Sequence, residues 1–147
     1  MFYSSIGCSK KSCRFLDGCV FLQNDGYCMK YYVRQLSYEP ASTVCRQDGG
    51  ELFRIDSYRK QLAMEHILSS VLSVTDDVIV QGTKDSQDRW LFDDGTPMTY
   101  FNWNSPDGQP NNGPTERYIH IKSSNQCLWN DFGSAERQFL CQINENN

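Results

Sequence analysis

Two short segments near the end of the chain decide its fold: Gln109-Pro110-Asn111-Asn112-Gly113-Pro114-Thr115-Glu116 and Trp129-Asn130-Asp131. They share side chains whose oxygen atoms suit a hard cation: Gln109, Asn111, Glu116, Asn130 and Asp131. Ca²⁺ takes about six to eight oxygen ligands from carboxylates, amide carbonyls and water. The carboxylates of Glu116 and Asp131 would balance its charge, and the set holds no His or Cys that would favour a transition metal. The two segments therefore predict one calcium site.

Pro110 separates the first two candidate ligands. Proline fixes φ, and a cis Gln109–Pro110 bond would turn the side chains of Gln109 and Asn111 to the same side. Taken alone, residues 109–114 also fit an ordinary loop, because Pro, Asn and Gly are typical of turns. Their combination with the acidic residue that follows and with the second segment favours a cation site.

Size and charge bound the class of protein. A chain of 147 residues is expected to form one domain with a sizeable core. The net charge of −4, without a basic block, argues against nucleic acid as a partner. No stretch of about 18 apolar residues occurs, so we expect no membrane-spanning segment.

Cysteine usage indicates the compartment. The chain has seven cysteines and no Cys-x-x-Cys metal clip, which favours a disulfide framework and a secreted, extracellular protein. We expect residues 1–18 to form a cysteine-bearing extension in which Cys8 pairs with Cys13, and residues 19–147 to form the domain. Since seven is odd, one cysteine is left for an interchain bond or a free thiol.

Local patterns predict an α+β domain with two helices and short antiparallel sheets. Apolar residues on both sides of Asn24-Asp25-Gly26 indicate a hairpin, which a Cys19–Cys28 bridge would close. Ser37 is expected to cap a helix over 38–47, and Asp56 or Ser57 a second helix. Strands are predicted over these ranges: 29–36, 51–55, 78–80, 118–121 and 139–143. The segment from Gln81 to Glu116 is rich in Gly, Pro, Asn and Asp, and a loop of this length is typically functional.

The two opening segments resemble the sugar-binding signature of C-type lectins, with Glu116 seven residues after Gln109. The similarity extends from Cys19 to Ile143, and it includes the run Tyr100 to Trp103 before the long loop. The hairpin near the start is similar to that of the long-form members, so the chain resembles a soluble, invertebrate-style single-domain lectin. The resemblance implies a C-type lectin-like fold with a long calcium- and sugar-binding loop, and a bridge between Cys45 and Cys141.

The resemblance also implies the roles of the site residues. In the family, two neighbouring hydroxyls of one sugar ring coordinate the calcium ion, and the metal ligands hydrogen-bond the same hydroxyls. This assigns sugar binding to four of the calcium ligands: Gln109, Asn111, Glu116 and Asn130. Asp131 would complete the metal site.

Three departures from the family pattern stand out. Tyr118 and Ser134 occupy the positions of the usual inner disulfide, so that bridge is absent. Arg117 stands where an auxiliary calcium site needs an acid, so we expect that site to be lost. The Gln-Pro-Asn triplet carries an amide on both sides of the proline, which predicts weaker calcium binding. Galactose-type sites of the family stack the sugar on an aromatic ring near position 113, which here is Gly113, so the resemblance favours mannose- or glucose-type over galactose-type sugars.

The predicted function is therefore a secreted, calcium-dependent lectin that binds cell-surface or microbial glycans in innate recognition or agglutination, with Ca²⁺ as cofactor. The alternative is a lectin-like domain that binds protein, ice or mineral without sugar. An enzyme is not expected, because Glu116 and Asp131 are committed to the metal and no catalytic set accompanies His66 or His120. If Cys8 and Cys13 pair, Cys127 remains as the interchain candidate; otherwise the extension carries the spare thiol. Either case predicts a disulfide-linked homodimer.

Overall fold

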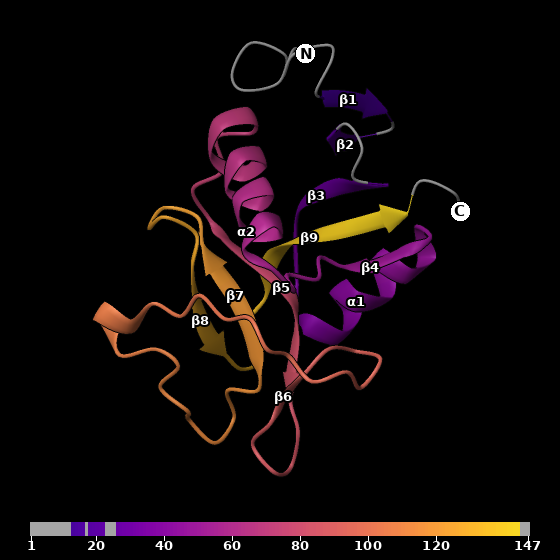
Figure 1. Cartoon of the computed structure of the whole chain (residues 1–147). Helices are drawn as coiled ribbons and strands as arrows, with labels where there is room; N and C mark the ends of the chain where they lie inside the picture. The colour runs from indigo at the N-terminus through magenta and orange to yellow at the C-terminus, as the bar shows by residue number, and fades with distance from the viewer. Residues whose placement is uncertain (1–12, 17, 23–25, 145–147) are drawn as a thin grey trace.

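The computed structural model describes residues 13–16, 18–22 and 26–144, which fold into one sheet with two main helices (Figure 1). The strands are β1 (Cys13–Leu16), β2 (Cys19–Leu22), β3 (Tyr27–Leu36), β4 (Gly50–Leu52), β5 (Asp77–Lys84), β6 (Trp90–Leu91), β7 (Tyr118–Lys122), β8 (Leu128–Phe132) and β9 (Arg137–Asn144). The helices are α1 (Tyr38–Gln47), α2 (Tyr58–Glu65), its π-helical continuation η1 (His66–Val71) and the short 3-10 turn η2 (Ser105–Asp107).

The sheet joins the two ends of the described chain. Its strand order is β1-β2-β3-β9-β5-β7-β8, with β4 paired to β9 and β6 paired to β5. All pairs are antiparallel except β5 with β9, which run parallel. The predicted short antiparallel sheets are therefore one mixed sheet. Sequence patterns miss this because the last strand enters the middle of the sheet, and that pairing is long-range.

Both predicted helices are confirmed. Helix α1 occupies 38–47 as expected, and α2 starts after Ser57, whose side chain accepts a hydrogen bond from Lys60 N at 3.2 Å. Ser37 is the N-cap residue of α1 but its side chain makes no capping bond. The Ser57 side chain thus satisfies an otherwise unpaired N–H of the first turn of α2, which explains why α2 begins after Ser57.

The two helices cover opposite faces of the sheet. Alternate residues of a strand point to opposite faces, and Val78 and Val80 of β5 pack in one core cluster while Ile79 packs in the other. Met64 of α2 belongs to the first cluster and Ala41 of α1 to the second. The core is therefore two apolar layers, one on each side of the sheet.

Two predicted disulfides are confirmed. Cys19 and Cys28 join β2 to β3, and Cys45 and Cys141 join α1 to β9 across 96 residues of sequence. The predicted Cys8–Cys13 bridge lies outside the described residues. Strand β1, which belongs to the predicted 1–18 extension, pairs with β2, and the domain boundary at residue 19 stays a prediction.

The long polar segment begins later than predicted. Strand β5 continues through Gln81 to Lys84, and β6 pairs with it, so regular structure reaches Leu91. Gln81 is buried because its amide is fully used: Nε2 donates to Leu52 O at 2.8 Å and Oε1 accepts from Asp93 N at 2.7 Å. A polar residue in a buried strand misleads hydropathy patterns when tertiary partners satisfy it.

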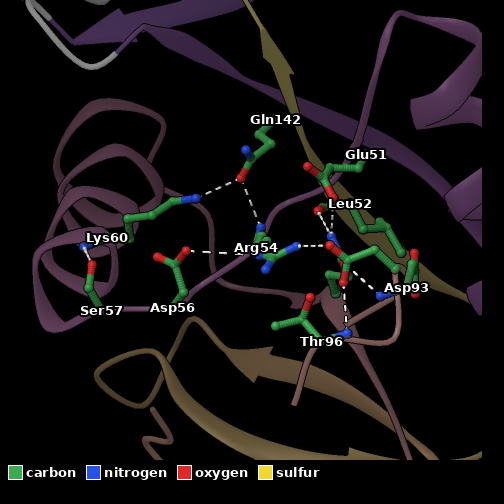
Figure 2. Close-up of polar contacts among 11 residues, drawn as sticks. Glu51, Leu52, Arg54, Asp56, Ser57, Lys60, Asp93, Thr96 and Gln142 are labelled. Atoms are coloured by element: carbon green, nitrogen blue, oxygen red, sulfur yellow. Dashed lines mark hydrogen bonds and ion pairs between the residues drawn. The ribbon is translucent and has the colours of Figure 1, made fainter. Parts of the chain in front are cut away.

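The turn at the start of the long segment is fixed by Arg54, which Figure 2 shows among its polar neighbours. Its backbone N donates to Gln142 Oε1 at 3.0 Å, and its guanidinium pairs with Asp94 at 2.9 Å and lies over the Phe92 ring at 4.1 Å. Hydrogen bonds from Thr96 and Arg54 hold the pKa of the Asp94 carboxyl well below its usual range. These contacts dock residues 92–96 on the sheet, so the long segment starts from a fixed point.

Cys127 is not the interchain cysteine that the sequence predicts. Its side chain is fully buried in the core, with Sγ 3.9 Å from Ser69 Oγ. A thiol in this place cannot reach a second chain while the domain is folded. The prediction is wrong because a turn between two strands, such as that between β7 and β8, is expected to face solvent. Cys127 is the last residue of this turn, has a left-handed backbone (φ 56°), and its side chain packs into the core.

The burial of Cys127 predicts its reactivity. Burial raises the pKa of the Cys127 thiol to about 11, so the reactive thiolate is scarce at about pH 8. Iodoacetamide should therefore not modify Cys127 in the folded protein at this pH. In denaturant the same thiol should be labelled to completion. Mass spectrometry of the peptide containing Cys127 measures both states. Rapid labelling of the native protein, or a Cys127-linked dimer on a non-reducing gel, would contradict the buried position.

Candidate functional site

The tertiary structure brings the two ligand-bearing segments together. Asp131, in β8, is only 4% exposed and accepts two backbone hydrogen bonds from the loop: Asn111 N at 3.0 Å and Asn112 N at 2.9 Å. Each carboxylate oxygen takes one donor. These bonds place residues 111 and 112 beside the strand that carries Asn130 and Asp131. The Gln109–Pro110 bond that precedes them is cis.

Two of the predicted ligands carry oxygen atoms that the protein itself does not use. Among the described residues, Gln109 Oε1 and Asn130 Oδ1 are buried side-chain atoms without a hydrogen-bond partner. Buried polar atoms in proteins are almost always paired, so unpaired ones call for an explanation. Only two further atoms of this kind occur in the described part of the chain, on Ser123 and Gln138.

Glu116 folds back over the loop. Its Oε2 accepts a hydrogen bond from Gly113 N at 3.2 Å, and the same N–H lies 3.3 Å from Asn111 Oδ1. A Cβ atom on Gly113 would lie 2.8 Å from Glu116 Oε2, closer than such atoms approach. Glycine at this position therefore gives the carboxylate of Glu116 the space that it occupies.

Two cationic side chains tie the loop to β5. The ammonium group of Lys84, a buried residue, donates to Asn112 Oδ1 at 3.3 Å. The guanidinium of Arg117 donates to the backbone carbonyls of Lys84 (3.0 Å) and Asp85. Arg117, which stands where the auxiliary metal site would need an acid, thus binds backbone oxygens and holds the end of the loop.

Trp129 connects the 129–131 segment to the chain that leads into the 109–116 segment. Its backbone N donates to Asn102 O at 2.9 Å, and its carbonyl accepts from Asn104 N at 2.8 Å. Asn104 O in turn accepts from Gln109 N at 3.1 Å, and the indole Nε1 donates to Gln61 Oε1 at 2.9 Å. Neither Asn104 nor Gln61 was predicted from the sequence as part of the site. A buried Gln in an amphipathic helix is the signal that was available, but its partners are more than sixty residues away.

A second polar region lies at the opposite end of β5 and β7. Asp77 pairs with Lys122 at 3.2 Å, with His120 at 3.7 Å and with Arg137 at 3.7 Å, beside a cavity of about 270 Å³. His120 is buried, and desolvation lowers its pKa to about 4. It is therefore neutral near pH 7 and accepts a hydrogen bond from Arg137. These groups satisfy one another and do not form a catalytic set.

Other classes of site are not found in the described residues. No group of three or more His, Cys, Asp or Glu side chains is arranged to hold a metal, and the candidate site, with two carboxylates and three amides, is of a different kind. No helix in this part of the chain is long and apolar enough to cross a membrane.

Known structures share this fold. The human scavenger receptor C-type lectin carbohydrate-recognition domain is 21% identical, with a TM-score of 0.74 over 90% of this chain and 100% of that chain. A calcium-independent type II antifreeze protein is 21% identical, with a TM-score of 0.72 over 90% of this chain and 95% of that chain. Human lithostathine is 15% identical, with a TM-score of 0.75 over 88% of this chain and 99% of that chain.

At these identities the similarity establishes the fold alone, and the antifreeze protein is described as calcium-independent. The family itself is established by sequence, because the model of the lectin C-type domain matches residues 34–143. This match includes α1, the long loop and all five predicted ligands. The chain belongs to the lectin C-type domain family.

Proposed function

We propose that this protein is a secreted lectin that binds carbohydrate through a calcium ion held by Gln109, Asn111, Glu116, Asn130 and Asp131. The observation that carries the proposal is the pair of buried, unpartnered oxygens on Gln109 and Asn130. A buried acceptor without a donor costs about 1–3 kcal/mol of stability. A cation between the two segments would satisfy both oxygens at once, and calcium prefers amide and carboxylate oxygens of this kind.

The remaining ligands fit the same role. Asp131 and Glu116 supply two negative charges, and the backbone N–H bonds that each accepts leave the second lone pair of each oxygen available. When bound, the calcium ion would offer coordination positions to two neighbouring hydroxyls of a sugar ring. The amide NH2 groups of Gln109, Asn111 and Asn130 would donate to those hydroxyl oxygens, and the Glu116 carboxylate would accept a hydroxyl proton.

The ligand set also bears on sugar class and affinity. With amides at both Gln109 and Asn111, the site offers donors on both sides of the proline and one negative charge less than a set with a carboxylate there. This supports a weaker calcium site and mannose- or glucose-type ligands. Gly113 leaves no aromatic ring at the position on which galactose-type sites stack the sugar.

Compartment and assembly belong to the same proposal. The bridges Cys19–Cys28 and Cys45–Cys141 support an oxidising, extracellular location. Because Cys127 is buried, a disulfide-linked homodimer would need a thiol from Cys8 or Cys13. Two linked sites would increase avidity for a surface with many glycans, in innate recognition or agglutination.

A second candidate function is a lectin-like domain that binds protein, ice or mineral without calcium. It is favoured by one feature of the loop: Asp131 and Glu116 already accept backbone hydrogen bonds, so the loop has internal contacts that need no metal. One structure of the same fold is titled calcium-independent. Glycan-array binding measured with calcium and with chelator separates the two functions.

Asn130→Ala tests the metal site directly. Since Asn130 Oδ1 is a buried acceptor without a partner, its removal should leave the metal-free protein at least as stable as the wild type, with a gain of up to about 1–3 kcal/mol. Calcium at a hundred times its Kd should stabilise the wild type by about 2.7 kcal/mol, and this gain should vanish in the variant together with sugar binding. Thermal unfolding in calcium and in chelator gives both quantities.

The matched control is Asn125→Ala, which removes the same side chain from an exposed position in the turn before β8. It should keep the full calcium-dependent stabilisation and the sugar binding. Sugar binding that persists in chelator, or an Asn130→Ala variant that responds to calcium like the wild type, would rule out the calcium mechanism.

Gly113→Ala tests the place of Glu116. The new methyl group must displace the Glu116 carboxylate, a flexible side chain, so stability in chelator should change little while calcium affinity falls by about tenfold or more. Gly108→Ala is the comparison: its φ of 72° strains any other residue, but nothing lies within 4 Å of the added atom. That variant should lose stability and keep its calcium affinity. Isothermal titration measures the affinities, and equal affinity in Gly113→Ala and wild type would contradict the assigned role of Glu116.

A further inference from the structure

Helix α2 reaches the candidate site through one buried side chain. Gln61 is 1% exposed, and both ends of its amide are used. Nε2 donates to Cys127 O at 3.1 Å and to Glu65 Oε2 at 3.1 Å, while Oε1 accepts from Trp129 Nε1 at 2.9 Å. Gln61 therefore holds the β7–β8 turn at Cys127 and the indole of Trp129 at the same time.

Trp129 passes this restraint to both halves of the site. It is joined to Asn130 by the chain itself, and its carbonyl binds Asn104 N, whose residue in turn accepts from Gln109 N at 3.1 Å. Asn130, which carries one unpartnered oxygen, directly follows Trp129 in the chain. Gln109, which carries the other, is connected to Trp129 by two backbone hydrogen bonds through Asn104. Both segments are therefore joined to the backbone of Trp129, while Gln61 holds its indole.

We propose that Gln61 is a positioning residue for the cation site: by fixing the Trp129 indole and the Cys127 carbonyl, it sets the relative position of Gln109 and Asn130. This inference rests on the proposed function for its consequence in calcium affinity. Its structural content, the placement of the two side chains, can be measured without metal.

The environment explains why one amide can have this effect. Trp129 and Cys127 are completely buried, so water cannot replace the bonds that Gln61 makes. The usual inner disulfide of the family is absent here, since its positions hold Tyr118 and Ser134. Without that covalent link, hydrogen bonds and packing hold the β7–β8 hairpin in place. Gln61 makes a hydrogen bond to each end of the 127–129 segment of this hairpin.

The test compares Gln61→Met with Leu52→Ala. The first keeps the length of the side chain and removes all three hydrogen bonds; the second destabilises the core cluster on the α1 side, away from Trp129. Calcium affinity is titrated well below the melting temperature of each variant. We expect Gln61→Met to bind calcium at least tenfold more weakly than the wild type, and Leu52→Ala to bind it with unchanged affinity although it also melts at a lower temperature.

A metal-free measurement keeps this inference separate from the proposed function. In chelator, the NMR side-chain amide signals of Gln109 and Asn130 should each be single and sharp in the wild type, and split or broadened in Gln61→Met but not in Leu52→Ala. If Gln61→Met does not fold, Gln61→Asn, which keeps a neutral amide but is one methylene shorter and cannot reach Cys127 O and Trp129 Nε1 at once, should give the same changes to a smaller extent.

Unchanged amide signals in the Gln61 variants would overturn the positioning role, whether or not the protein binds calcium. Equal loss of affinity in Gln61→Met and Leu52→Ala would also overturn it, because the effect would then follow global stability. If substitution of Gln61 changes the amide signals but the wild type binds no calcium, the proposed function is refuted and the positioning role is retained.

Discussion

The fold depends on the insertion of the last strand into the middle of the sheet. Strand β9 pairs with β3 on one side, in an antiparallel register from Tyr27↔Asn144 onward, and with β5 on the other, in parallel. It also pairs with β4, and Cys141 within it is bridged to Cys45 of α1. Neither half of the sheet is complete without this strand. The sheet is therefore complete only when the last described strand is in place between β3 and β5 (Figure 1). The long loop that follows β6 extends from this completed sheet.

The candidate site is built almost entirely on hydrogen bonds to backbone groups. Asp131 holds the loop by two amides, Arg117 holds its end by two carbonyls, and Trp129 joins the preceding segment by its own backbone. In place of the family's inner disulfide, the ring of Tyr118 stacks on Tyr38 of α1 at 4.3 Å. Contacts of this kind are individually weak, but they are buried and mutually consistent, so they specify one arrangement of the loop.

Elements with local signals were predictable, and elements with long-range partners were not. Helix α1 was predicted at its observed bounds because Ser37 and the Gly49-Gly50 pair mark its two ends in the local sequence, although the Ser37 side chain makes no capping bond. Strand β8 was not assigned, although it carries Asn130 and Asp131, because Leu-Trp-Asn-Asp-Phe does not alternate apolar and polar residues and the strand is defined by its pairing with β7. Strand β6 has two residues and exists through its pairing with β5. The buried state of Gln81 was missed for the same reason, since tertiary partners satisfy its amide.

The sequence by itself determined the two helices, the Cys19–Cys28 bridge and the candidate ligand set, because residue type and spacing along the chain carry that information. Its resemblance to C-type lectins implied the family and the Cys45–Cys141 bridge. Only the tertiary structure decided that Cys127 faces the core, that the sheet is single and mixed, and that Gln61 holds Trp129. It also decided which ligand oxygens are left without partners. Burial and hydrogen-bond satisfaction are properties of groups brought together from distant parts of the chain, so no local pattern contains them.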